Sequence, residues 1–368
     1  MSFNKISSLP RNITLQLTEL CNLRCKMCYF WGETGTYSNS ESGKKPATLD
    51  IDLLVRLIRE LSSSKAYYSL FGGEPLTYPH LEELILAIKK AGSVMDTPTN
   101  GTLLTEHAKM LVKTQFDYIR VSIDGPREIN DSQRGKGSYN KAMSGIEALY
   151  EEKKRRGACK PSIEILFTIT PKNYYSIEQF ALKELNLDAI DRISFQMENY
   201  LTEPMGTTYS KMLKSEFNIL SDRYWKGLVR NPKDFDRIDT KELARQVNNV
   251  HKQLRRMNKI LMLEPPTFSH ENLSAYIKAD WNRMIDQYET CYFPWVSVDI
   301  TATGDLAPCH VFYDLIMGNL YEKNFTEIWN GENYQKFREH MSKNKLMSIC
   351  QGCCILYLAG KKKRKQKR

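Results

Sequence analysis

Residues 20–29, LCNLRCKMCY, place Cys21, Cys25 and Cys28 in the spacing C-x3-C-x2-C, directly after an alternating apolar run over residues 13–17. The run predicts a strand, so the three thiols gather at a strand end. A structural zinc site takes four protein ligands, whereas three thiolates suit an iron–sulfur cluster that keeps one iron open for a substrate or cofactor. For this stretch alone, scattered structural thiols and a degenerate zinc site remain alternatives.

The first 200 residues alternate predicted strands with predicted helices. Behind a cap at Asp50 or Asp52, for example, apolar residues recur at helical spacing over residues 53–61. Six strand–helix units predict an α/β fold with a parallel sheet, outer helices, and ligands bound beyond the C-terminal strand ends. The predicted strands cover residues 13–17, 67–71, 94–97, 118–123, 163–170 and 192–197.

Three later strand ends carry loops with groups suited to a polar ligand. Paired glycines let the backbone approach a ligand, and a glutamate beside them offers an acceptor for an ammonium group. A hydroxyl and a carboxylate suit ribose hydroxyls, and an arginine suits a carboxylate. Each loop alone is explained as a turn, but their order at successive strand ends favours one shared site. The residues are Gly72, Gly73, Glu74 and Pro75, then Thr99 and Asn100, then Ser122, Asp124 and Arg134.

Together these motifs resemble the radical S-adenosylmethionine (radical SAM) superfamily. The resemblance implies a partial (β/α)6 TIM-like barrel in which Cys21, Cys25 and Cys28 hold a [4Fe-4S] cluster, with S-adenosylmethionine (SAM) chelating the open iron. The glycine-rich loop would bind the methionine amino group, and the later loops the rest of the cofactor. Many relatives carry an aromatic residue before the third cysteine. Here that residue is Met27 and the aromatic Tyr29 follows, so the adenine contacts depart from the pattern.

A second group of cysteines lies near the C-terminus. Alternating apolar residues over 296–300, a turn at 303–305 and a return over 306–309 predict a hairpin. Four thiolates beside a hairpin suit a zinc ribbon as well as a cluster. The group comprises Cys291, Cys309, Cys350, Cys353 and Cys354, and four residues separate Gly304 from Cys309.

Beside a radical SAM core, this block resembles the auxiliary-cluster region of the SPASM/twitch branch. The chain ends soon after Cys354, so the shortened twitch form with one auxiliary cluster is the better match. This resemblance implies a second [4Fe-4S] cluster held by Cys291, Cys309, Cys350 and Cys353, with Cys354 able to substitute.

The predicted domain organisation has four parts. Residues 1–200 form the partial barrel, and residues 201–288 form a helical insertion that packs against it or completes a substrate pocket. Residues 289–360 form the twitch domain, and residues 361–368 a basic disordered tail.

Composition limits the class of protein. The 368 residues are 41% hydrophobic, enough to fill a core. The chain has no run of about eighteen apolar residues and no signal-peptide stretch, so we expect a cytoplasmic protein in which cysteines bind metal. The ninth cysteine, Cys159, is predicted to be an ordinary buried thiol.

The formal net charge of +10 comes mostly from the last eight residues, which carry seven positive charges. Such an end is typically solvated and disordered, and the alternative is an electrostatic contact with an anionic membrane, nucleic acid or an acidic partner. Nucleic acid is disfavoured because no aromatic residues interleave the charges.

The resemblance implies a reaction. Flavodoxin or ferredoxin would supply an electron, SAM would be cleaved reductively, and a 5′-deoxyadenosyl radical would abstract hydrogen from an unactivated C–H of a small-molecule or lipid substrate. The auxiliary cluster would assist oxidation or coupling of the substrate radical. A ribosomal-peptide maturase is the alternative, and a zinc-ribbon binding protein the remote one. Gln196, Glu198 and Tyr200 are candidates to face the substrate, and no catalytic base is assigned.

Overall fold

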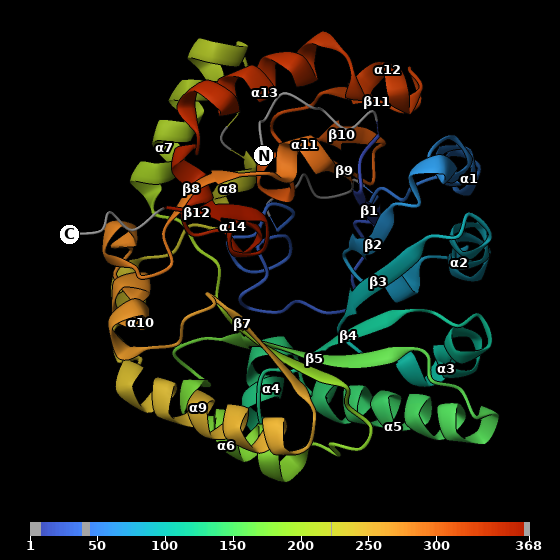
Figure 1. Ribbon diagram of the computed structural model, residues 1–368, viewed down its shortest axis with the longest axis vertical. Coiled ribbons are helices and arrows are strands. Elements are labelled where there is room, and N and C mark those ends of the chain that lie inside the picture. The colour runs from blue at the N-terminus through green and yellow to red at the C-terminus, as the bar shows by residue number, and fades with distance from the viewer. Residues whose placement is uncertain (1–8, 39–44, 222, 364–368) are drawn as a thin grey trace.

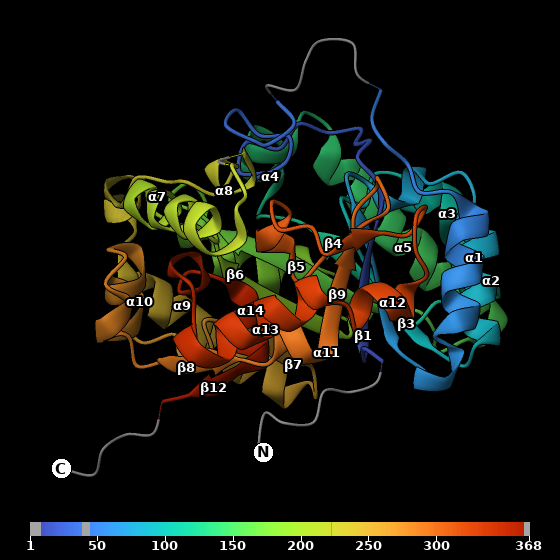
Figure 2. The same cartoon turned by 90° about the horizontal axis from the view of Figure 1, so that it is seen from above.

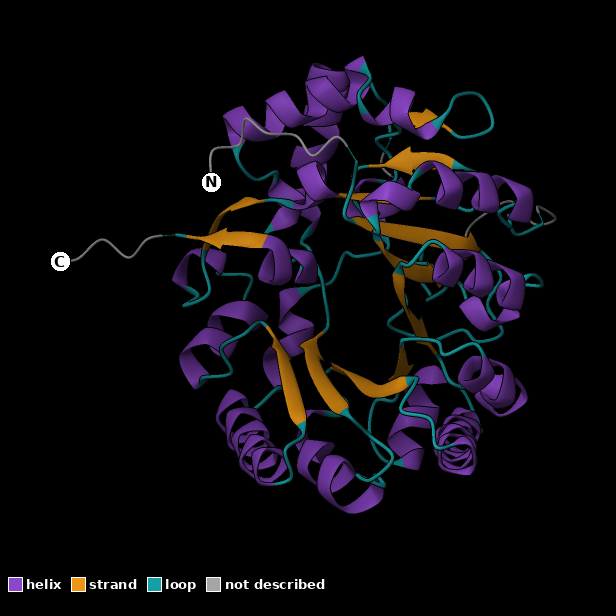
Figure 3. Ribbon diagram, turned by 45° about the vertical axis from the view of Figure 1, so that its right-hand side comes forward, coloured by secondary structure: helices purple, strands orange, loops and turns teal. Residues whose placement is uncertain are grey.

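A ten-stranded sheet organises the protein in the computed structural model, which describes residues 9–38, 45–221 and 223–363. The sheet curves into an open barrel with helices around its outside (Figures 1 and 3). In sheet order, the strands are β11 (Gly318–Asn319), β10 (Asp305–Ala307), β9 (Ser297–Ile300), β1 (Asn12–Thr18), β2 (Tyr67–Gly72), β3 (Val94–Thr99), β4 (Tyr118–Ser122), β5 (Ser162–Ile169), β6 (Arg192–Met197) and β7 (Ile260–Glu264). All neighbouring pairs from β9 to β7 are parallel, which confirms the predicted α/β architecture.

Apolar side chains at alternate strand positions are buried on the outer face of the sheet, beneath the helices. In β4, for example, Ile119 and Val121 are fully buried in the main core, while Arg120 between them points to the other side. That other side is the interior of the barrel, because the helices lie outside it (Figure 1). The covering helices are α1 (Ile51–Glu60), α2 (Leu81–Lys90), α3 (Leu104–Lys113), α4 (Arg127–Arg134), α5 (Ser138–Arg156) and the short α6 (Ile177–Gln179).

The stretch predicted to be a helical insertion also contains a strand. β7 pairs in parallel with β6, so it extends the six predicted parallel strands at that edge. The strand was missed because its sequence, ILMLE, has no apolar–polar alternation and follows closely on the apolar stripe of a helix. The helices of this region are α7 (Glu203–Met212), α8 (Arg223–Lys226), α9 (Thr240–Arg256) and α10 (His270–Ile277).

The C-terminal hairpin joins the barrel instead of standing apart from it. The predicted hairpin is present as β9 and β10, and Gly304 in its turn has a φ of +83° that favours glycine. β9 pairs with β1, which would otherwise be an edge strand of the barrel. A short helix, α11 (Phe293–Val296), precedes the hairpin. Three helices follow it: α12 (Phe325–Trp329), α13 (Glu332–Asn344) and α14 (Cys354–Ala359).

The start of the predicted disordered tail is ordered. Gly360–Lys362 forms β12, which pairs with β8 (Tyr288–Cys291). Lys361 lies 3.6 Å from Glu289, and Lys362 lies 3.2 Å from Asp286, so two charges of the basic run have acidic partners. The rest of that prediction, residues 364–368, lies outside the described residues.

Two further observations concern sequence predictions. Cys159 is exposed, so its prediction as a buried thiol is wrong: it lies in the connection between α5 and β5 and not on an apolar face. In the described parts of the chain, every helix is too short or too polar to cross a membrane.

Helix α1 offers a test of the local fold. The Asp50 side chain accepts a hydrogen bond of 2.9 Å from the backbone N–H of Leu53, which caps the helix. We expect Asp50→Ala to lower the free energy of unfolding by about 1 kcal/mol, measured by urea denaturation, because one N–H loses its acceptor. Asp52→Ala, an exposed first-turn control, should cost less, and an equal loss in both variants would contradict the capping role.

Candidate active site

The loop that follows β1 holds the first three cysteines at one end of the barrel, beside α4 (Figure 2). Backbone hydrogen bonds shape it: Cys28 N–H donates to Cys25 O over 3.1 Å, and Gly32 N–H donates to Cys28 O over 2.8 Å. Lys26 N–H donates to Gln133 O over 2.9 Å and anchors the loop to α4. All three cysteines are half-buried, so their thiols are shielded yet reachable.

The electrostatics of these thiols suit a bound cation. Burial is the largest cause that raises the pKa of Cys21 to about 11 and that of Cys25 to about 12, and the neighbouring cysteines contribute to both values. Arg24 opposes this rise at Cys21, and Arg134 does so at Cys25. The thiols of Cys21 and Cys25 are therefore protonated at neutral pH unless a metal displaces the protons, and two guanidinium groups offset the resulting negative charge.

The glycine pair after β2 lies directly against the cysteine loop. A Cβ on Gly73 would stand 2.1 Å from the carbonyl oxygen of Leu20, and one on Gly72 would stand 2.4 Å from that of Thr18. Gly72 also has a φ of +136°, which a residue with a side chain rarely adopts. Only glycine fits at both positions, so the two loops pack backbone to backbone.

Glu74 ties the loops after β2 and β3 together. Its fully buried carboxylate accepts hydrogen bonds from Thr99 Oγ1 (2.7 Å), Asn100 N–H (2.8 Å) and Leu76 N–H (3.1 Å). Burial raises its pKa, and these three donors oppose the rise. A carboxylate has about four acceptor sites, so one is left for a ligand ammonium group. The structure thus brings Glu74, Thr99 and Asn100 together.

Asp124 and Arg134, predicted to contact different parts of a cofactor, bind each other. Arg134 Nε donates to Asp124 Oδ2 over 2.6 Å, and Arg134 Nη2 donates to Oδ1 over 3.1 Å. Thr168 N–H also donates to Asp124 Oδ1, over 2.9 Å. The pair is buried, and the carbonyl of Arg134 lies 3.8 Å from Cys25 Sγ, so this ion pair positions the wall of the cysteine loop.

Four cysteines of the C-terminal group line one small cavity. They come from the end of β8, the segment after β10 and the turn before α14, so segments far apart in the sequence meet there. The remaining walls are apolar. The lining residues are Cys291, Cys309, Cys350 and Cys353 with Phe293, Pro294, Val311, Phe312, Met341, Ile355 and Leu356.

These four thiols also lie in a dry setting. Burial raises the pKa of Cys291 to about 11 and that of Cys350 to about 12, and it raises that of Cys309 well above its usual value. Four convergent soft ligands inside apolar walls fit a metal centre whose positions are all filled by protein.

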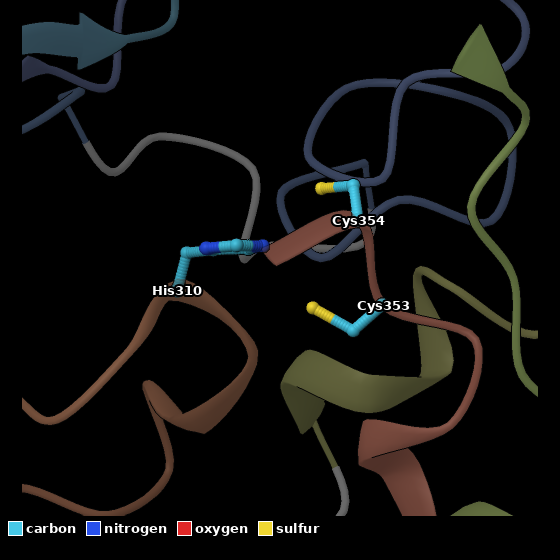
Figure 4. Close-up of side chains that lie close together, drawn as sticks. All are labelled: His310, Cys353 and Cys354. Atoms are coloured by element: carbon cyan, nitrogen blue, oxygen red, sulfur yellow. The ribbon is translucent and has the colours of Figure 1, made fainter. Parts of the chain in front are cut away.

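His310 and Cys354 stand next to this cavity. In Figure 4 the His310 ring points toward the thiols of Cys353 and Cys354, and the donor atoms of the three residues lie within 4.8 Å of one another. His310 Nδ1 is also 3.8 Å from Cys309 Sγ. This trio therefore adds a nitrogen and a further thiol beside the four-cysteine cavity. The sequence did not single out His310, although its place next to Cys309 was a signal.

Comparison with known families gives the same division. Residues 15–180 match the family model of the "Radical SAM superfamily", and residues 291–354 match the SPASM model, an "Iron-sulfur cluster-binding domain". The chain belongs to the radical SAM superfamily. A radical SAM domain implies SAM and a [4Fe-4S] cluster, and a SPASM domain implies auxiliary iron–sulfur centres.

Individual radical SAM relatives differ in how much of the chain they share. The tungsten-containing aldehyde ferredoxin oxidoreductase cofactor-modifying protein of Pyrococcus furiosus is 25% identical over 93% of this chain and 86% of its own length. The Fe-coproporphyrin III synthase of Methanosarcina barkeri is 33% identical over 50% of this chain, which spans only 43% of that relative. The crystal structure of Streptococcus suis SuiB bound to SAM has the same fold, with a TM-score of 0.63, 17% identity, and coverage of 94% of this chain and 72% of that one.

Several predicted residues of this radical SAM enzyme occupy other roles in the structure. Tyr200 is buried and donates a hydrogen bond of 2.6 Å to Tyr276 O, so it belongs to the core and not to an open substrate surface. Glu198 pairs with Arg230 over 2.7 Å. Arg230, which the sequence did not indicate, also donates to Met27 O over 3.1 Å and so links the region of α8 to the cysteine loop.

The remaining predicted residues lie where they can still contact a ligand. Gln196 on β6 is half-buried on the interior face, and Ser122 is half-buried at the end of β4. Tyr29 is half-buried beside Phe30, with ring centroids 4.3 Å apart. Their contacts with SAM or substrate stay predictions.

The buried Asp124–Arg134 pair predicts a large effect of one substitution. Asp124→Asn replaces a carboxylate oxygen with an amide that faces a donor, so we expect about 3 kcal/mol of lost stability in thermal or chemical denaturation. Iron retention by the cysteine loop should also fall, because the carbonyl of Arg134 lies against Cys25 Sγ and its side chain is held by Asp124. The control is Glu128→Gln, which changes an exposed residue of α4, the helix that carries Arg134. Equal stability of the two variants would contradict the role of the Asp124–Arg134 pair in positioning the cysteine loop.

Proposed function

We propose that this radical SAM enzyme abstracts a hydrogen atom from an unactivated C–H bond of a substrate bound inside the barrel, and that an auxiliary [4Fe-4S] cluster assists oxidation or coupling of the product of that step. The observation that carries the proposal is the presence of two separate thiol sets, one in the loop after β1 and one lining the C-terminal cavity. Phe30, two residues after Cys28, stacks on Tyr313, four residues after Cys309, with ring centroids 6.2 Å apart, so the segments that carry the two sets are neighbours.

The cysteine loop and the loops beside it would bind different parts of the cluster and its cofactor. Cys21, Cys25 and Cys28 would hold the first cluster, and the backbone at Gly73 leaves space for a cofactor beside it. The free acceptor site of Glu74 suits an ammonium group. When bound, the cluster and SAM supply the one-electron chemistry that activates a substrate C–H bond. Flavodoxin or ferredoxin is the proposed electron donor.

Aromatic side chains close the site from one side. Phe30 stacks on Tyr37 with ring centroids 5.0 Å apart and on Tyr313 at 6.2 Å. Gln16 Nε2 donates to Tyr37 Oη over 2.8 Å, which fixes this cluster to the interior face of β1. Excluding water from the space between the thiol sets protects reactive species from side reactions.

The second set would hold a fully ligated cluster. Cys291, Cys309, Cys350 and Cys353 leave no metal position open, which suits electron transfer better than substrate coordination. The proposal for the substrate covers small molecules and, as the second candidate, a ribosomal peptide, because a SuiB structure with the same fold holds the precursor peptide SuiA.

The first test concerns the cysteine loop. In the anaerobically reconstituted chain, replacing Cys21, Cys25 and Cys28 with Ala should leave about half of the iron and abolish formation of 5′-deoxyadenosine from SAM. Cys159→Ala, which alters an exposed thiol outside both sets, should change neither quantity. Full cleavage activity in the triple variant would refute the assignment.

The second test concerns the auxiliary set. Cys309→Ala should lose the iron of the second cluster while still forming 5′-deoxyadenosine, since cleavage needs only the first cluster. Cys354→Ala should keep both clusters, because Cys354 does not line the four-cysteine cavity. Iron analysis and electron paramagnetic resonance of the reduced proteins measure both outcomes, and loss of the cluster in Cys354→Ala alone would transfer the ligand role to that residue.

A further inference from the structure

Charged side chains form a ladder across the interior face of the barrel. Arg120 of β4 is directly paired with Glu164 of β5, and Glu164 with Arg192 of β6. Their neighbours along each strand, such as Ile119 and Ile163, are fully buried on the helix side, so the charged residues point inward. Alternating charges on three adjacent strands are unusual for a barrel interior, which is ordinarily filled by branched apolar residues.

The ladder is joined by ion pairs. Arg120 Nη1 lies 2.8 Å from Asp96 Oδ2, and Arg120 Nε lies 3.9 Å from Glu164 Oε1. Arg192 Nη1 lies 3.5 Å from Glu164 Oε2. We call Asp96, Arg120, Glu164 and Arg192, together with Glu264 described next, the interior charge cluster.

Glu264 completes this cluster from β7 and has no partner of its own. It is paired in the sheet with Gln196, which places it on the interior face. The described residues offer it neither a hydrogen bond nor an ion pair. Burial raises its pKa to about 7, the charge of Arg120 opposes the rise, and the charge of Glu164 adds to it. An unpaired carboxyl in this position costs stability that a bound cation would recover.

The cluster borders open space. The side chains of Arg120 and Arg192 are each 32% exposed although they lie on the interior face. On β7, Ile260 and Met262 are 48% and 38% exposed on the side that carries Glu264. Asp96 is almost fully buried, yet its Oδ1 has no hydrogen-bond partner. Charged and apolar groups are thus both available to a ligand here.

We infer that the interior charge cluster binds the charged end of an amino-acid-like or peptide substrate, with an ammonium group at Glu264 and a carboxylate at the guanidinium of Arg120. Arginine binds carboxylates through paired donors, and a carboxylate is the natural acceptor for an ammonium group. An acyl chain in the same place would bury these charges without compensation. This inference rests on the proposed function, since it assigns the substrate class of that site.

The position of the cluster also sets a length. Arg120 precedes Asp124, which lies beside the cysteine loop, by four residues, or about 13 Å of extended chain. A substrate that reaches from the cluster to the cofactor therefore carries its charged end on the order of 10 Å from the reacting C–H bond.

The test uses the reconstituted full-length chain with SAM, without a reductant. Binding of triglycine, a zwitterion, is compared by saturation-transfer NMR with its acetylated and amidated neutral form and with hexanoate. We expect triglycine to bind best, and Glu264→Gln and Arg120→Met each to weaken it about tenfold, the effect of losing one charge-assisted hydrogen bond. Glu82→Gln, which removes a charge from an exposed ion pair with Lys113, is the matched control and should leave binding unchanged.

The outcomes separate this inference from the proposed function. Hexanoate binding as tightly as triglycine, or equal triglycine binding by Glu264→Gln and the native chain, would show that the cluster is purely structural. Neither result depends on cofactor cleavage, which the cysteine variants test. If Arg120→Met fails to fold, Glu264→Gln still decides the question, because Glu264 has no partner to lose and its substitution should leave the melting temperature unchanged or raised.

Discussion

Three thiols can share one metal centre only if the backbone holds them together before the metal arrives, and the end of β1 imposes that order here. β1 lies between β9 and β2: β9 pairs with Asn12 to Leu15, and β2 continues the pairing to Thr18, where the cysteine loop begins. The cysteine loop then packs on Gly73 with no room for a side chain. The free energy for gathering three partly desolvated thiols comes from this surrounding sheet, because the thiols themselves gain nothing from being close.

Buried carboxylates connect the cysteine loop's surroundings by hydrogen-bonding neighbouring strand ends to one another. Glu74 joins the ends of β2 and β3 through Thr99 and Asn100, and Asp124 joins β4 to β5 and α4 through Thr168 and Arg134. Each buried charge is offset by several donors, as a desolvated carboxylate requires. Residues that the motifs predict to contact the cofactor therefore also form the hydrogen bonds that connect neighbouring strand ends.

The sequence predicted the parts of this protein that repeat a simple pattern. Six strands and the capped helix α1 were found because apolar periodicity and the cap at Asp50 are local signals. The pairing of Asp124 with Arg134 was not, since a motif names residue types and not the direction in which side chains point. β7 was missed because its residues ILMLE do not alternate between apolar and polar. Tyr200 was misplaced because its burial depends on contacts with Tyr276 from a distant helix.

In the C-terminal region, the spacing of the cysteines predicts which residues form a site but not how the chain folds around it. The cysteine spacing selected the four residues that line one cavity, yet it gave no sign that β9 would extend the barrel sheet through β1. β9 pairs with β1, and Cys309 follows β10 of the same sheet, so one member of the second thiol set is attached to the sheet that carries the first set. The other members come from β8 and from the turn before α14, so this site also depends on contacts between segments far apart in the sequence. The charged side chains of β4 to β7 lie on the interior face of the same sheet, where we propose that the substrate binds.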